Sequence, residues 1–438
     1  MKISKSILFF LTLFFINLNA QDIPPEVLER MPAEMKEKIL AEKEEKSKDY
    51  ETIQEFLDDG EYETNDGFMT LHKNVEDDEY FLQLDKNDLE KEFIYFAYVL
   101  NAPQAAGVRG GAIGQGAVLE FRRFKDEIAL FKKNTNFSNE TDNNIGKADL
   151  TNIMEAFLDS FEVVVEEGES IVISVSDLFL SETLTSVSPN LPREYRDFVD
   201  LDLGRLDDDK TFINQVRNYP KNTAVEVTFG FSNPKPNQRN AVYAVADARF
   251  TSIVARHLFV EMPDDQFNTR VADQRVGYFS QRVTDLSTYD NYPQRDLINK
   301  WRLIKKDPEA ELSEPVNPIV FWVEKSTPEE IKPMVVKGIE AWNLAFERAG
   351  FKNAIVAKIQ PDDADWDAGD IQYNVVRWSS SPRPAFSGYG PSIGNPRTGE
   401  LIAADIVQEF NAIKRGYNYR KLWGWTPEND PLEQWIIS

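Results

Sequence analysis

The sequence predicts an α+β protein in which a β-rich amino-terminal domain precedes a unit of one strand, one long helix and three further strands. Short runs of β-branched and aromatic residues, separated by turn residues, recur between residues 67 and 263 and indicate many strands. Apolar residues then recur every three or four positions from 331 to 349, which indicates an amphipathic helix. Strand-like runs lie on both sides of that helix, so the second unit combines the two element types.

The β-rich domain is expected at residues 67–263, a polar connector at 264–314 and the second unit at 315–438. Residues 21–66 are strongly charged and predict a solvated linker or loose helix, the alternative being a propeptide-like segment that covers a cleft. The strands of the β-rich domain are expected at 68–72, 80–84, 93–100, 117–124, 128–131, 161–165, 170–175, 224–231, 241–246 and 251–260.

The second unit opens with the apolar run 318–323, which is typical of a buried strand. Thr327 and Glu330 have the spacing of a capping box at the start of the helix, although Pro333 favours a regular helix that begins there. Gly350 provides the left-handed stop. The later strands are expected at 354–359, 371–378 and 401–410.

Four motifs occur in order in this second unit, at 338–351, 369–374, 390–392 and 396–401. Together they resemble a large group of secreted bacterial zinc-dependent metalloproteases, whose catalytic domain is of zincin (metzincin-like) type. The resemblance implies that 315–438 forms the upper part of such a domain, a twisted sheet with one long helix behind it. It also implies that the last strand lies along the cleft and pairs with a peptide or protein substrate.

The same resemblance implies a catalytic zinc on a downstream helix with the motif H-E-x-x-H. Two imidazoles one helical turn apart would hold the ion, and the glutamate would deprotonate its water. This sequence has only His72 and His257, expected to be ordinary strand or surface residues, and no H-E-x-x-H. We therefore expect zinc in the complete family enzymes, none in this chain, and a catalytic domain truncated before its metal site.

The composition argues against several classes of function. The formal net charge of −25 argues against nucleic acid or an anionic membrane as a partner. The absence of cysteine removes disulfides, thiolate catalysis and cysteine-based zinc sites.

The amino terminus has the pattern of a signal peptide at residues 1–20. Lys2 and Lys5 precede an apolar run at 7–16, and the segment ends in the small residue Ala20. A retained anchor is the alternative, although the run is too short for a bilayer-spanning helix. We expect the mature protein in the periplasm or outside the cell, with no membrane contact after cleavage.

The run 401–410 is the candidate for substrate binding. If it is an exposed edge strand, its backbone can pair with an extended peptide, whereas an ordinary interior strand is the alternative. The nearby Arg397 and Glu400 could form a structural ion pair. The residues expected to bind substrate are Ala403, Ala404, Asp405, Ile406 and Val407.

An acidic loop before the third strand is the candidate for calcium. Asp363, Asp365 and Asp367 stand at positions one, three and five of a calcium-loop pattern. Ala368 replaces the required glycine and Asn374 the bidentate glutamate, so a solvated turn is the alternative.

Two hypotheses of different class follow. In the first, the chain is the amino-terminal portion of an exported zinc metallopeptidase that hydrolyses peptide bonds only when complete, because no catalytic residue lies in this sequence. In the second, it is a non-catalytic exported protein that binds peptides or acts as an inhibitor through its exposed strand. The sequence indicates no oligomeric state.

Overall fold

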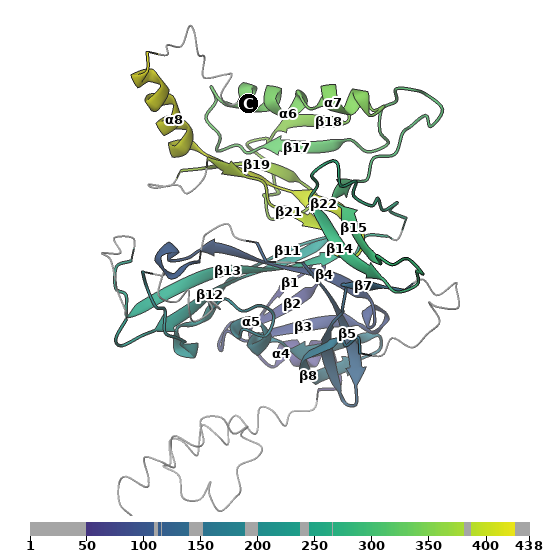
Figure 1. Cartoon of the computed structure of the whole chain (residues 1–438). Helices are drawn as coiled ribbons and strands as arrows, with labels where there is room; N and C mark the ends of the chain where they lie inside the picture. The colour runs from purple at the N-terminus through teal and green to yellow at the C-terminus, as the bar shows by residue number, and fades with distance from the viewer. Residues whose placement is uncertain are drawn as a thin grey trace, which may run out of the picture.

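The computed structural model describes residues 50–108, 113–114, 116–139, 152–188, 200–236, 245–264, 266–380 and 387–424. Within them the protein is rich in strands and has few helices, which confirms the α+β prediction. Two parts are stacked on each other: a large antiparallel sheet, and a smaller sheet with helices on its far side (Figure 1). Residues 1–49, which include the predicted signal peptide, lie outside the described residues.

The first part is a twelve-stranded sheet in the described residues, in the order β1-β2-β3-β9-β8-β6-β5-β4-β13-β12-β10, with β11 also paired to β12. The helices α4 (Ile53–Asp58) and α5 (Ser176–Leu180) pack beside it. The strands are β1 (Tyr62–Asn65), β2 (Thr70–Asn74), β3 (Tyr80–Asp85), β4 (Glu92–Asn101), β5 (Ala117–Phe124), β6 (Glu127–Lys132), β8 (Ala156–Glu167), β9 (Ser170–Ser174), β10 (Arg205–Leu206), β11 (Phe212–Tyr219), β12 (Asn222–Ser232) and β13 (Phe250–Glu261).

The sheet curls until its ends meet at β1 and β11. The Asn218 side-chain amide donates to the Asn65 carbonyl at 2.8 Å, and the Asn65 amide donates to the Val216 carbonyl at 3.2 Å. Side chains from most strands fill the interior, and β12 illustrates the alternation that directs them inward. Its fully buried core residues occupy every second position: Val225, Val227, Phe229 and Phe231.

Residues 50–66 are not the solvated linker that their charge predicts. Thr52 caps α4 by accepting a hydrogen bond from the Glu55 N–H at 3.1 Å, and Phe56 is only 2% exposed. Phe56 packs against Tyr62 and Phe81 in a cluster under the closed sheet. This acidic stretch is therefore packed on the first part, with Phe56 at the centre of the contact.

The second part is a five-stranded sheet in the order β18-β17-β19-β23-β20, in which β20 alone runs antiparallel to its neighbour. Helices α6 and α7 cover its face away from the closed sheet (Figure 1). A short sheet, β16-β22-β21, lies between the two parts. The elements are β16 (Lys300–Trp301), β17 (Ile319–Val323), α6 (Lys332–Glu340), α7 (Asn343–Arg348), β18 (Ile355–Ile359), β19 (Asn374–Ser379), β20 (Gly388–Tyr389), β21 (Ser392–Gly394), β22 (Glu400–Ala404), β23 (Ile406–Glu409) and α8 (Phe410–Leu422).

The predicted single helix is in fact two. It begins at Lys332 with Pro333 in its first turn, and no side chain caps it, so the expected capping box is not formed. Val335 and Ile339 are buried against the sheet, but Trp342 is 64% exposed. The Asn343 side chain bonds both the N–H and the C=O of Ile355, which fixes the start of α7 to β18 and breaks the continuous apolar face.

The connector 264–314 contains the hairpin β14 (Ser280–Asp285) and β15 (Gln294–Ile298), to which β7 (Phe137–Ser138) adds. Strand β16 follows and pairs with β22, so the connector joins the two parts by backbone pairing. No helix in the described ranges has the length and apolarity needed to cross a bilayer.

Candidate functional site

The run 401–410 does not form the exposed edge that we predicted. Strand β22 lies between β16 and β21, and β23 lies between β19 and β20. Val407, for example, pairs with Arg377 on one side and Tyr389 on the other. The cause is the preceding segment, 388–394, which folds back antiparallel along the run. Of the predicted binding residues, Val407 is paired on both sides, whereas Ala403, Ala404, Asp405 and Ile406 each pair with the backbone of a neighbouring strand or segment on one side. None of them lies on an edge strand of its sheet.

Asp405 marks the point where the chain passes from one sheet to the other. The Ala404 N–H donates to the Asn374 side-chain oxygen at 2.9 Å, and the Val375 N–H donates to Asp405 Oδ1 at 3.0 Å. These two side chains replace backbone pairing at the junction of β22 and β23. The aspartate is thereby fixed in place.

The edge of the five-stranded sheet next to this run belongs to 388–390 instead, and β18 forms the opposite edge. The Glu409 N–H donates to the Ser387 carbonyl and the Asp405 N–H to the Pro391 carbonyl, so the odd-numbered residues bond inward. Because bonding alternates along an antiparallel pair, the N–H and C=O groups of Gly388 and Gly390 point outward. Both glycines are exposed, and no strand of the described residues pairs with that side.

A pocket of about 320 Å³ lies between the two parts, next to this edge. The β4 and β13 strands of the closed sheet form one wall, and β19, β20 and the β22–β23 junction form the other. Its polar lining includes Tyr98, Arg256, Glu324, Arg377, Tyr389 and Asp405.

The charges in this pocket differ in how they are neutralised. Arg256 forms an ion pair with Glu226 on the neighbouring strand. Arg377 forms no hydrogen bond or ion pair with a described residue. Burial raises the pKa of Asp405 to about 6, although Arg377 and Arg256 oppose the shift. Burial likewise raises the pKa of the Tyr98 hydroxyl. A carboxyl group with a pKa near neutrality, inside a pocket, is a frequent mark of a functional site.

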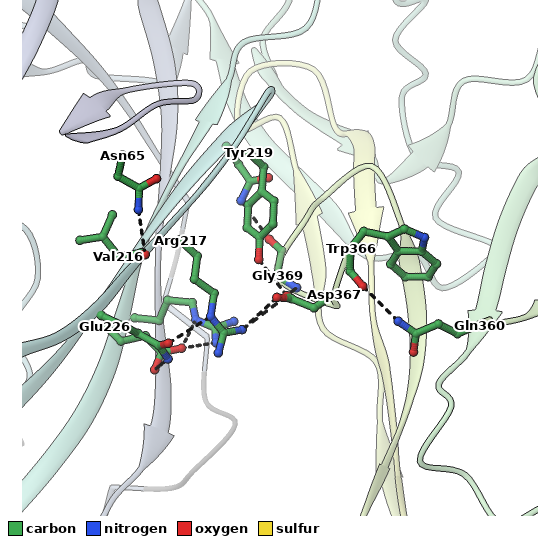
Figure 2. Close-up of polar contacts among 12 residues, drawn as sticks. Asn65, Val216, Arg217, Tyr219, Glu226, Gln360, Trp366, Asp367 and Gly369 are labelled. Atoms are coloured by element: carbon green, nitrogen blue, oxygen red, sulfur yellow. Dashed lines mark hydrogen bonds and ion pairs between the residues drawn. The ribbon is translucent and has the colours of Figure 1, made fainter. Parts of the chain in front are cut away.

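The acidic loop joins the two parts rather than surrounding a metal. Asp367 accepts hydrogen bonds from the Tyr219 hydroxyl at 2.8 Å and the Gly369 N–H at 2.6 Å, and Arg217 lies 3.4 Å away (Figure 2). Burial opposes ionisation of Asp367, but the Gly369 N–H, Tyr219 and Arg217 outweigh it and lower its pKa. Asn222 completes the joint by bonding the Gly369 carbonyl at 2.9 Å and the Ile371 N–H at 3.1 Å.

The described residues do not bring the three predicted calcium ligands together. Asp363 and Asp365 are exposed, and Asp367 turns to Tyr219 and Arg217 instead of toward them. Among the described residues no group of three or more histidine and acidic side chains is placed to hold a metal ion.

We expect Asn222→Ala to lower the free energy of unfolding by about 2 kcal/mol, because a buried carbonyl and a buried N–H lose their partner. Urea denaturation followed by tryptophan fluorescence measures this, since Trp366 lies in the affected loop. Asn214→Ala, which removes an exposed hydrogen bond to Thr228, is the matched control and should cost less than about 1 kcal/mol. Equal losses in the two variants would contradict a role for Asn222 in joining the parts.

The two histidines lie in the closed sheet, apart from the pocket. His72 contacts Thr64 at 2.9 Å and Gln83 at 3.0 Å through its two ring nitrogens. His257 is fully buried and contacts the Tyr95 hydroxyl at 2.8 Å. Both ring nitrogens of His72 and the Nδ1 of His257 therefore have protein partners.

The expected ion pair between Arg397 and Glu400 is not formed. Arg397 contacts Glu92 of β4, and Glu400 accepts two hydrogen bonds from Arg302, at 2.6 and 2.8 Å. Both ends of the turn are thus tied to other segments, because the pairing of β22 with β16 brings Arg302 next to Glu400.

Sequence reasoning identified Asp405 but missed the residues that surround it. Arg377 interrupts the apolar run 375–378, and a charge inside a buried strand could have indicated a polar site on that face. Gly388, Tyr389 and Gly390 are compatible with a turn as well as with an edge strand, so the sequence alone does not indicate the edge. Tyr98 and Arg256 come from the other part, and no local signal in the sequence connects them to Asp405.

Comparison with known proteins adds one match. A family model described as a domain of unknown function (DUF5117) matches residues 110–306. This range covers the later strands of the closed sheet and the connector as far as β16, and ends before β17. No curated protein and no solved structure matches the chain.

Proposed function

We propose that this chain carries the substrate-binding part of an exported zinc-dependent metallopeptidase of zincin type, and that it binds an extended peptide along Gly388–Gly390. The single observation that carries the proposal is the outward-facing backbone of these two exposed glycines, next to the pocket. Unpaired N–H and C=O groups at a sheet edge are the usual template for an added peptide strand.

The four motifs of the resemblance fit this arrangement. Residues 338–351 form the end of α6, all of α7 and the turn after it, and 369–374 lead into β19. Residues 390–392 lie at the edge, and 396–401 form the turn into β22. The first two motifs therefore belong to the five-stranded sheet and the helices on it, and the last two lead from its edge into the short sheet. This grouping supports a zincin-like upper half-domain. The exported location, periplasmic or extracellular, is proposed from the signal-peptide pattern alone.

A catalytic zinc does not fit the described residues. His72 and His257 lie on different strands of the closed sheet, and both ring nitrogens of His72 have protein partners. His257 is fully buried with its Nδ1 on the Tyr95 hydroxyl, and neither histidine belongs to a group of three or more metal-binding side chains among the described residues. We therefore assign no catalytic step to this chain. Its proposed share of the reaction is to hold the peptide in an extended conformation.

Replacement of Gly390 tests the edge directly. Gly390→Pro removes the outward N–H and should weaken peptide binding about three- to tenfold, the worth of one net hydrogen bond. Gly390→Ala keeps that N–H, and a Cβ there meets only ordinary contacts, with the nearest atom at 3.6 Å. Fluorescence titration with an extended, unstructured peptide measures both affinities. Equal affinity of the two variants would exclude pairing at this edge.

A non-catalytic peptide-binding protein is the second candidate, favoured by the lack of a metal-ligand cluster in the described residues. Both candidates predict binding, so incubation of the purified 438-residue chain with peptide and zinc cannot distinguish them. A longer protein, expressed from DNA that includes the codons after 438, does distinguish them. Zinc-dependent cleavage by the extended product supports the first candidate, and binding without cleavage supports the second.

A further inference from the structure

Two side chains of opposite charge face the same pocket without an ion-pair partner among the described residues. Asp405 uses one oxygen to accept from the Val375 N–H, and its second oxygen has no hydrogen bond from a described group. Arg377 lies on the neighbouring strand β19. The two are not within ion-pair distance of each other, so each is available to a ligand.

The sheet places both groups on the pocket side. Val376 and Ile406 pack toward the helices in the core of the second part. Because side chains alternate along a strand, Arg377, Asp405 and Val407 face the opposite way, into the pocket. Tyr389 on the edge strand lies beside them.

The remaining charges favour a cationic ligand. Three carboxylates line the pocket (Asp370, Glu324 and Asp405) against two guanidinium groups. One of those, Arg256, is already neutralised by Glu226. The local field therefore attracts an ammonium group more than a carboxylate.

We propose that the pocket binds the primary ammonium group of a peptide, with Asp405 as its charge partner and Arg377 as the donor to the carbonyl oxygen next to it. A peptide's amino-terminal residue presents both groups a few bonds apart, whereas a lysine side chain presents the ammonium alone. The inference rests on the proposed function, since it names the chemical group of the bound peptide that the pocket beside the edge strand would recognise.

The position of the pocket relative to the edge supports this assignment. The odd-numbered residues Tyr389, Pro391 and Ile393 line the pocket, while the outward backbone groups belong to Gly388 and Gly390. A peptide that pairs with the edge therefore has a neighbouring residue at the mouth of the pocket. A volume of about 320 Å³ is at the small end of ligand sites and suits one terminal residue.

The test is a set of fluorescence titrations on the full chain. Three peptides share one extended sequence. The first has a free amino terminus and no lysine, the second is acetylated and has one lysine, and the third is acetylated and has no lysine. Glycinamide and N-acetylglycinamide probe the pocket without strand pairing. We expect the free amino terminus to bind at least about tenfold more tightly than its acetylated form, as for a charge-assisted hydrogen bond.

Asp405→Asn should abolish that difference while Asp363→Asn, on the exposed loop, preserves it. A tenfold gain with the lysine peptide instead would support the ammonium site and assign it to side chains. Equal affinities of all three peptides would overturn the inference and leave the edge proposal intact. If no peptide binds but glycinamide does, through Asp405, the ammonium site stands and the edge proposal fails. Failure of glycinamide and every peptide overturns both.

Acid provides a second readout. Asp405 loses its charge below a pKa of about 6, so affinity for the ammonium ligand should fall as the pH drops through that value, by about tenfold in total. A profile that is flat from pH 7.5 to 5 would contradict the assignment. The charged and titratable groups that face Asp405 from the surrounding elements are Tyr98, Arg256, Glu324, Asp370, Arg377 and Tyr389.

Discussion

Asp405→Asn is expected to stabilise the protein by about 2–3 kcal/mol at pH 8, and by almost nothing below pH 4. Burial raises the pKa of Asp405 from 3.8 to about 6, so the folded state favours the neutral carboxyl. The protonated carboxyl makes its full contribution to the free energy of unfolding below the pKa of Asp405 in the unfolded chain. That contribution is lost as the pH rises through 6. Asparagine is uncharged throughout and still accepts from the Val375 N–H, so it avoids that loss.

Urea denaturation at pH 4, 6 and 8, followed by tryptophan fluorescence, measures the effect, because all eight tryptophans lie at residue 301 or later. Asp363→Asn controls for the removal of one negative charge from an acidic chain and should change stability by less than about 0.5 kcal/mol. Destabilisation by Asp405→Asn at pH 8 would mean that the carboxylate is a structural anchor, and would remove the argument for a binding role.

A stabilising effect would carry a functional meaning. Residues that make a protein less stable than their nearest neutral replacement are concentrated at sites where function needs them. At Asp405 the unfavourable state is the one required to bind a cation at neutral pH. The stability measurement and the peptide titrations therefore test the same carboxylate in two independent ways.

Local patterns in the sequence predict much of the fold. The β-type runs 117–124 and 251–260 predict β5 and β13 closely, and the apolar run 318–323 predicts β17. These strands have one or both faces buried, so their sequences are rich in the apolar residues that a buried strand requires. Strand β11 lacks such an apolar pattern, because Phe212 is 55% exposed and the other positions mix polar and apolar residues. Its place is set by pairing with β12, which lies outside its own sequence.

The candidate site was less predictable, because it depends on which strands become neighbours. The sequence of 401–410 is compatible with an edge or an interior strand, and only the return of 388–394 decides between them. In the same way, the spacing of the aspartates in 363–367 favours calcium until Tyr219 and Arg217 arrive from the closed sheet. In both cases the deciding partners lie outside the run itself.

Acid should destabilise the closed sheet through His257, by about 3 kcal/mol between pH 6.5 and 4. Full burial lowers the pKa of this histidine from 6.5 to about 4, opposed only by the nearby Phe179 carbonyl. The Nε2 atom makes no hydrogen bond of normal geometry with a described group, so a proton gained there would be poorly satisfied. In that pH range the unfolded chain binds a proton that the folded chain does not. Stability therefore falls as the pH falls.

His257→Asn keeps an acceptor for the Tyr95 hydroxyl and removes the titrating ring. It should lower the free energy of unfolding at pH 7.5, because it leaves a cavity. Between pH 6.5 and 4, however, its free energy of unfolding should fall by about 3 kcal/mol less than that of the wild type. Far-UV circular dichroism in urea is the suitable measurement, because the closed sheet contains no tryptophan. His72→Gln is the matched control, and it should retain the acid dependence since His257 is intact. If both variants lose acid sensitivity equally, or neither does, the buried ring of His257 is not its source.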